Sequence, residues 1–251
     1  MILVLLPGMD GTGDLFGPLV AAFGDELEVR VVGYPTGEKL DYRELETFTR
    51  ERLPTQGNFV LVAESFSGPI AISLAASRPA GLVGLVLCNT FARNPHPELA
   101  ALAPLVNFLP LKLAPVAVLS RVLLGRFSTP YLESTFRSAL SQVPASVLRA
   151  RIKAVVNVDV TARLREIRIP LLCLVADQDE VVPRATATYI AEVVPTAQIV
   201  VIAGPHFLLQ AAPVAAAAAI RAFLPSCEKA SGGPARRPGA KESLAKLEFA
   251  R

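Results

Sequence analysis

Short apolar runs, bounded by glycine, proline or polar turns, divide the chain at regular intervals. Runs of this length without polar alternation are typical of strands that are buried on both faces of a parallel sheet. They span residues 2–6, 28–33, 59–63, 84–89, 171–176 and 197–203. Segments of helical length lie between most of them and after the last, at residues 18–23, 42–53, 69–77, 184–194 and 214–224. This alternation predicts an α/β fold with a mainly parallel, six-stranded sheet and helices on both faces.

One interval between strands is too long for a plain crossover. Residues 91–168 separate two strands, whereas a crossover needs only about a dozen residues. The leucine, valine and alanine spacing of this insertion, interrupted by prolines, predicts several short helices. We therefore divide the chain into a core and two additions: the core at 1–90 and 169–225, a helical cap at 91–168, and a disordered basic tail at 226–251.

The charge is unevenly distributed between these parts. The chain is 52% hydrophobic and 19% charged with a net charge of +3, which is the balance of a globular domain. The tail holds six basic and three acidic residues, so the first 225 residues are neutral, and within them the cap holds eleven basic and four acidic residues. Because the tail has no aromatic interleaving and no recognisable binding module, nucleic acid is not an expected partner.

Cysteine usage and apolar run length indicate the compartment. Cys88 and Cys173 lie in predicted strands and Cys227 lies at the tail boundary, so neither a disulfide framework nor a metal-binding spacing results. No basic segment precedes the first apolar run, and no run approaches about 20 residues, which argues against a signal peptide and a transmembrane helix. We expect a cytoplasmic protein without a metal.

A serine stands between a predicted strand and a predicted helix. The strand at 59–63 runs into Glu64-Ser65-Phe66-Ser67-Gly68, and the helix follows directly. Small residues two positions to either side of the serine are what a nucleophile elbow requires, because the tight turn presses them against neighbouring backbone. Ala63 and Ser67 occupy those positions instead of the usual glycines. The alternative is an ordinary turn with a capping serine.

Two histidines are candidates for the base that such a serine needs. His206 follows the strand at 197–203, and the carboxyl ends of strands are where ligands lie in open α/β sheets. His96 lies in Asn-Pro-His-Pro-Glu at the start of the cap and is interpreted as a solvated loop histidine. We expect His206 to be the base.

Two aspartates after the strand at 171–176 are candidates for the carboxylate that orients this base. Asp177 and Asp179 both fit the chain order serine, acid, histidine. The alternative for either is a turn residue that caps the next helix, and this alternative is favoured for Asp177.

A glycine-rich loop follows the first strand. The loop Pro7-Gly-Met-Asp-Gly-Thr-Gly13 offers backbone N–H groups to a developing oxyanion, and the N–H of Phe66 would be a second donor. A phosphate-binding loop is the alternative, but Gly8, Gly11 and Gly13 lack the spacing of nucleotide-binding motifs.

Together these features resemble the α/β-hydrolase superfamily across almost all of residues 1–225. The resemblance implies an α/β-hydrolase fold whose chain opens on the strand usually numbered third, with the cap over the active site. It implies Ser65 as nucleophile, His206 as base and Asp179 rather than Asp177 as the acid. It also implies an oxyanion hole formed by the N–H groups of Phe66 and Met9, with Asp10 as the next candidate for the latter.

The resemblance further implies a serine carboxylesterase-like enzyme that cleaves acyl esters without a cofactor, similar to bacterial methyl ester esterases that act on carrier proteins. The apolar run at 99–124 suits an acyl chain, or it packs the cap onto the core. The cap charge, including Arg149, Arg151 and Lys153, suits an acidic carrier protein, or it is a solvated helix surface. Glu64 is assigned no role and is expected to pair with an arginine or to face solvent.

Three other functions stay open from the sequence. The Asp-Gly-Thr-Gly loop also resembles that of plant-type acyltransferases of this fold, in which an alcohol replaces water at the acyl-enzyme. A lipase or lysophospholipase has the same chemistry on a membrane-bound substrate. A hydrolase fold can also serve as a non-catalytic binding module.

Overall fold

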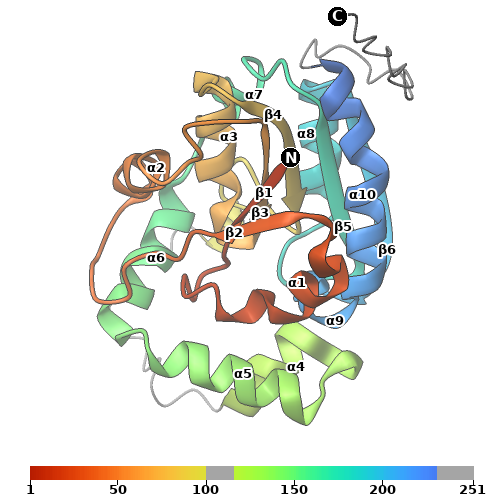
Figure 1. Cartoon of the computed structure of the whole chain (residues 1–251). Coiled ribbons are helices and arrows are strands. Elements are labelled where there is room, and N and C mark those ends of the chain that lie inside the picture. The colour runs from red at the N-terminus through yellow and green to blue at the C-terminus, as the bar shows by residue number, and fades with distance from the viewer. Residues whose placement is uncertain (100–115, 231–251) are drawn as a thin grey trace, which may run out of the picture.

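A computed structural model describes residues 1–99 and 116–230 (Figure 1). Within these residues the strands form one parallel sheet in the order β2-β1-β3-β4-β5-β6. The strands are β1 (Ile2–Leu6), β2 (Glu28–Val31), β3 (Phe59–Glu64), β4 (Leu82–Cys88), β5 (Leu171–Gln178) and β6 (Ala197–Pro205). Each of the six predicted strands is present, and the predicted six-stranded parallel sheet is confirmed.

Helices cover both faces of the sheet, as predicted. Alternate side chains of β1 point to opposite faces, so Val4 and Leu6 join one apolar cluster while Leu3 and Leu5 join another. The first cluster includes side chains of α2, α3 and α8, and the second includes side chains of α1, α9 and α10. These helices are α1 (Gly17–Phe23), α2 (Tyr42–Arg50), α3 (Gly68–Ser77), α8 (Ala185–Val193), α9 (Leu208–Ala211) and α10 (Pro213–Ala230).

The two edge strands are more exposed than the sequence predicts. All six apolar runs were expected to be buried on both faces, but Val31 on β2 is 42% exposed and Ile199 on β6 is 39% exposed. An edge strand has a neighbour on one side only, so apolar composition alone does not bury its outer side chains. The expectation of burial on both faces is therefore wrong for β2 and β6.

The last helix extends beyond its predicted end. α10 continues to Ala230 rather than ending at Leu224, and the predicted tail from residue 226 therefore begins inside this helix. Cys227 is fully buried there, and a Cβ added to Gly84 of β4 would lie 2.3 Å from its Sγ. This packing explains why the helix continues. Residues 231–251 of the predicted tail lie outside the described residues, and within the described ranges no helix is long and apolar enough to cross a bilayer.

The segment predicted as a cap is helical where the structure describes it. Its helices are α4 (Val116–Leu124), α5 (Pro130–Ser141), α6 (Ala145–Asn157) and α7 (Thr161–Leu164), and residues 100–115 lie outside the described residues. Pro130 is the first residue of α5 and Pro144 is the N-cap of α6, so these prolines start helices. Figure 1 shows α4 and α5 beyond the carboxyl ends of the strands, far from the N-terminus.

One buried arginine joins α6 to the glycine-rich loop after β1. Arg151 Nη1 donates hydrogen bonds to the carbonyl oxygens of Met9 at 2.8 Å and Asp10 at 2.7 Å, and Nη2 donates to that of Pro35 at 3.2 Å. The residue is only 2% exposed. A Cβ added to Gly11 would lie 2.5 Å from Nη1, so the glycine leaves room for the guanidinium. The interpretation of Arg151 as part of an exposed basic surface is therefore wrong.

We predict that Arg151→Met lowers the free energy of unfolding by about 2–4 kcal/mol, because one buried and two partly buried carbonyl groups lose their donor. Arg151→Lys should lose less, since an ammonium group keeps the charge but lacks the planar fork of donors. Urea unfolding measures both. Lys153→Met, two residues along α6, is the matched control, and an equal loss in that variant would contradict the assigned role.

Candidate functional site

The backbone of Ser65 adopts a conformation that non-glycine residues rarely occupy. Its φ is 48°, in the left-handed region, at the step from β3 into α3. Thr90 Oγ1 donates a hydrogen bond to the Ser65 carbonyl oxygen. A Cβ added to Gly68 would lie only 1.9 Å from Thr90 Oγ1, so this contact requires glycine. The turn therefore has the strained geometry that is typical of a nucleophile elbow.

Ser67 replaces the second elbow glycine without the expected steric conflict. Its φ is −80°, which any residue can adopt. Its hydroxyl donates to the Pro7 carbonyl oxygen and contacts the Tyr34 hydroxyl, which ties the elbow to the loop after β1. Gly68, one position later, is the residue of the elbow that must lack a side chain.

The structure brings Ser65, His206 and Asp179 into one hydrogen-bonded chain. His206 Nε2 lies 2.9 Å from Ser65 Oγ, and His206 Nδ1 lies 2.9 Å from Asp179 Oδ2. A carboxylate only accepts hydrogen bonds, so Nδ1 carries the proton and Nε2 accepts from the serine hydroxyl. Asp179 Oδ1 also accepts the backbone N–H groups of Val181 and Val182. Both the histidine and aspartate side chains are 4% exposed.

Asn89 holds the histidine segment in place, which the sequence did not indicate. This residue follows β4, is buried and has a φ of 45°. Its side-chain amide donates to the His206 carbonyl oxygen at 2.8 Å, and its carbonyl oxygen accepts the N–H of Ala176 at 2.8 Å. One side chain therefore fixes the ends of β5 and β6 relative to β4.

The rejected candidates, Asp177 and His96, have other partners. Asp177 Oδ1 accepts the N–H of Gly204 at 2.9 Å and so joins β5 to β6, rather than capping the next helix. His96 is half-buried, and its Nε2 lies 2.7 Å from the Val181 carbonyl oxygen. That hydrogen bond raises the pKa of His96. His96 is thus not the freely solvated histidine that we expected.

The two predicted oxyanion donors belong to different segments, Met9 to the loop after β1 and Phe66 to the turn between β3 and α3. The Gly8 carbonyl oxygen accepts the N–H of Gly11 at 3.1 Å, and the C=O and N–H of one trans peptide point in opposite directions. The N–H of Met9 therefore points away from this turn, and Met9 lines a cavity together with Ser65. Phe66 follows Ser65, and its ring stacks on Tyr42 with centroids 4.9 Å apart. The oxyanion-hole role of Met9 and Phe66 stays a prediction.

A cavity of about 280 Å³ opens onto Ser65 and His206. Its wall is mostly apolar, and α4, α5 and α6 supply much of it. Among the described residues, no basic residue of the cap lines it, and the charged residues in its wall are Asp10 and Glu64. The apolar cap residues in the wall are Leu119, Val122, Leu123, Phe136, Leu140, Leu148 and Ile152.

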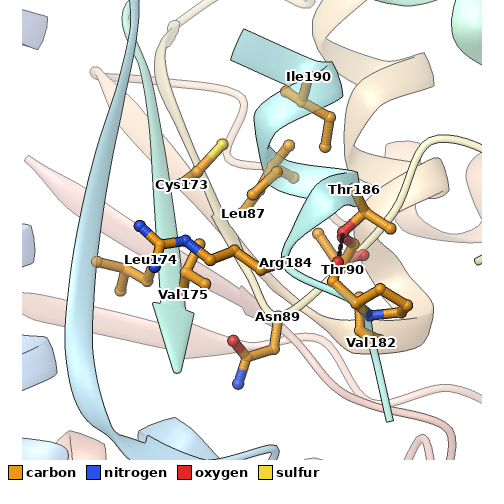
Figure 2. A pocket seen from close by; sticks show the side chains of 12 residues that line it. Leu87, Asn89, Thr90, Cys173, Leu174, Val175, Val182, Arg184, Thr186 and Ile190 are labelled. Carbon is orange, nitrogen blue, oxygen red and sulfur yellow. Dashed lines mark hydrogen bonds between the residues drawn. The ribbon is translucent and has the colours of Figure 1, made fainter. Parts of the chain in front are cut away.

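A much smaller hollow lies on the α8 side of β4 and β5 (Figure 2). Leu87, Cys173 and Ile190 are among its apolar lining residues, and the Thr186 hydroxyl donates to the Thr90 carbonyl oxygen at 2.9 Å. At about 10 Å³ it has room for about one water molecule. We assign this hollow to support of the segment after β4 rather than to substrate binding.

Glu64 neither pairs with an arginine nor faces solvent, contrary to expectation. It is 2% exposed, and its Oε2 accepts a hydrogen bond from Gln210 Nε2 at 3.1 Å. Burial, together with the nearby Asp10 charge, raises the pKa of Glu64 to about 8, against the opposing effect of the Gln210 hydrogen bond. Its position directly before the elbow serine was a signal in the sequence, but the residue type alone did not predict burial.

We predict a pH-dependent difference in stability between the wild type and Glu64→Gln. An acid whose pKa is higher in the folded chain binds its proton more tightly there. The contribution of Glu64 to the free energy of unfolding of the wild type is therefore complete below about pH 4.5 and decreases as the pH rises to about 8. The variant cannot titrate, so its stability relative to the wild type should rise by up to about 1.4 kcal/mol per pH unit in that window.

Urea unfolding at several pH values measures this difference. Glu192→Gln on the exposed face of α8 changes the same charge and should track the wild type. A difference between Glu64→Gln and the wild type that stays constant with pH would show that Glu64 is already ionised in the folded protein.

Comparison with known structures shows the same fold in several enzymes. The enol-lactonase from Burkholderia xenovorans LB400 is 20% identical, with a TM-score of 0.76 over 89% of this chain and 91% of that one. An esterase from Thermogutta terrifontis is 22% identical, with a TM-score of 0.76 over 90% of each chain. A bromoperoxidase from Bacillus anthracis is 18% identical, with a TM-score of 0.76 over 89% and 91%. At these identities the likeness establishes the fold alone.

Sequence comparison identifies the family. A search of curated proteins finds no match, whereas a model of the alpha/beta hydrolase family matches residues 3–220. The match includes the loop after β1, the elbow and the segments that carry Asp179 and His206, and membership supports hydrolase activity. The chain belongs to the alpha/beta hydrolase family.

Proposed function

We propose that this protein is a serine hydrolase that cleaves carboxylic esters with an apolar acyl group. The observation that carries the proposal is the hydrogen-bonded chain from Ser65 through His206 to Asp179, with 2.9 Å at each step, which opens onto an apolar cavity. Nucleophile, base and orienting acid are thus already within reach of one another.

The proposed reaction proceeds through an acyl-enzyme. Ser65 Oγ attacks the acyl carbon while His206 Nε2 takes its proton, and the imidazolium then protonates the leaving alkoxide. Asp179 holds the Nδ1 proton and stabilises the imidazolium. The N–H groups of Met9 and Phe66 are the proposed donors to the oxyanion. His206 next takes a proton from water, whose oxygen attacks the acyl-enzyme. The imidazolium then returns the proton to Ser65 Oγ as the acid leaves.

The cavity wall supports an apolar acyl group as the substrate class. Leucine, valine, isoleucine and phenylalanine side chains from α4, α5 and α6 surround the space above Ser65. Burial of each methylene group of an acyl chain there contributes about 0.8 kcal/mol. The same helices offer no cation to a charged acyl group within the described part of the wall.

Three variants test the proposed roles of Ser65 and Asp179, with Asp177 as the control. Hydrolysis of p-nitrophenyl esters should fall at least about 10³-fold in Ser65→Ala, and about 10⁴-fold in Asp179→Asn because the amide favours the wrong histidine tautomer. Asp177→Asn keeps an oxygen for the Gly204 N–H and should stay within about tenfold of the wild type. Wild-type activity in Ser65→Ala would rule out the proposed reaction.

An acyl chain carried on an acidic protein is a second candidate substrate. It is favoured by three exposed arginines on the cap, Arg121, Arg126 and Arg137. Val122, next to Arg121 in α4, is both exposed and part of the cavity wall. A basic surface of this kind attracts an acidic partner at low ionic strength.

Replacement of these three arginines by glutamate should lower kcat/KM for carrier-bound esters by about tenfold or more at low salt. Hydrolysis of small neutral esters should stay the same, because none of the three side chains lines the cavity. Equal effects on both substrates, or on neither, would contradict recognition of a carrier by this surface.

A further inference from the structure

The cavity wall contains a carboxyl group that the proposed reaction does not use. Glu64 ends β3, directly before Ser65, and lines the cavity. Its Oε2 accepts a hydrogen bond from Gln210, while its Oε1 is buried without a partner in the part of the chain that the structure describes. A buried oxygen without a partner is costly, so this carboxyl group needs a further explanation.

Gln210 presents the complementary problem. It lies on α9, four residues after His206, and is 3% exposed. Its own Oε1 also lacks a donor among the described residues. A single proton on Glu64 Oε1 can satisfy both oxygens after a small rotation, because a neutral acid and an amide form two reciprocal hydrogen bonds. An ionised Glu64 instead leaves two acceptors without a donor.

The surroundings also favour the neutral acid. A Cβ added to Gly8 would lie 3.6 Å from Asp10 Oδ1 and 3.9 Å from Glu64 Oε2, so both carboxyl groups approach the same point. On the neighbouring strand β4, Cys88 is paired with Glu64, and burial keeps the pKa of its thiol well above its usual range. Asp179 and His206 face the site from the ends of β5 and β6. No salt bridge to Glu64 occurs within residues 1–99 and 116–230.

We propose that Glu64 is a positioning residue that works only as the neutral acid: paired with Gln210, it holds the segment of His206 against Ser65, and loss of its proton switches the site off. This inference rests on the proposed function. Ionisation would break the bond from the acid to the amide. It would also place a negative charge in the wall of the cavity in which the substrate's carbonyl oxygen becomes an oxyanion, and so oppose the transition state.

The test is the ratio of kcat/KM at pH 9.5 to that at pH 7, measured with a neutral p-nitrophenyl ester. Since the pKa of Glu64 is about 8, kcat/KM of the wild type should be about 30-fold lower at pH 9.5 than at pH 7. In Glu64→Gln the two amides keep the reciprocal pair without a titrating proton. The fall should then be less than about threefold. A merely structural role for Glu64 would leave the pH profile of the variant like that of the wild type.

Two controls isolate the effect. Glu192→Gln, on the exposed face of α8, removes the same charge and should show the wild-type fall. Gln210→Met removes both the partner of Glu64 and the donor that lowers the pKa of Glu64. Its kcat/KM should therefore be low already at pH 7, and its remaining decrease with pH should move to higher pH. This variant decides the question if Glu64→Gln does not fold.

The outcomes separate this inference from the proposed function. Suppose that Ser65→Ala is inactive. If kcat/KM then decreases equally with pH in the wild type and in Glu64→Gln, or does not decrease in the wild type, the role of Glu64 is overturned while the proposed serine hydrolase stands. If Ser65→Ala is as active as the wild type, the proposed function fails. In that case the protonated-acid carbonyl band in a pH-difference infrared spectrum, present in the wild type at pH 7 and absent in Glu64→Gln, still reports whether Glu64 is neutral.

Discussion

The left-handed backbone of Ser65 is the constraint on which the rest of the site depends. A non-glycine residue in this region costs about 1–3 kcal/mol and persists only where its surroundings fix it. Here the Thr90 hydroxyl binds the Ser65 carbonyl oxygen, Gly68 admits Thr90 at close range, and Ser67 binds the loop after β1. These contacts come from the carboxyl ends of β1, β3 and β4. The parallel pairing of the strands therefore directs the serine hydroxyl toward His206.

The sequence predicted those parts of the site that follow from local pattern and strand order. Ser65, Asp179 and His206 each follow an apolar run, and the carboxyl ends of parallel strands meet at one edge of a sheet. Their proximity therefore follows from the fold class. The hydrogen bonds of Arg151 and Asn89 were not predicted, because the partners of these side chains lie more than 80 positions away along the chain. Residue type shows that a side chain can donate a hydrogen bond, but not which carbonyl group folding will place beside it.

Glu64 and the edge strands show that residue type alone does not determine burial. Glu64 is more buried than its type predicts, and the edge strands are less buried. A glutamate is rarely buried without a charged partner, so the sequence indicated exposure where the structure shows burial beside Gln210. Apolar residues of β2 and β6 indicated burial where the edge position leaves them exposed. In both cases the environment is set by tertiary neighbours. Charge is divided in a similar way: most arginines of the cap are exposed, whereas the wall of the cavity is mostly apolar and its charged residues are acidic.

The contact between Arg151 and the loop after β1 limits how this protein can be re-engineered. An insertion between two strands is an attractive part to exchange when a different substrate range is wanted, since Ser65, His206 and Asp179 all lie outside it. Here, however, the inserted segment also supplies the donor for the Met9 and Asp10 carbonyl groups. A grafted segment without a guanidinium at that point would alter the pocket and release the proposed oxyanion loop at the same time. Substrate range and catalytic geometry are therefore not separately exchangeable in this chain unless the graft retains Arg151.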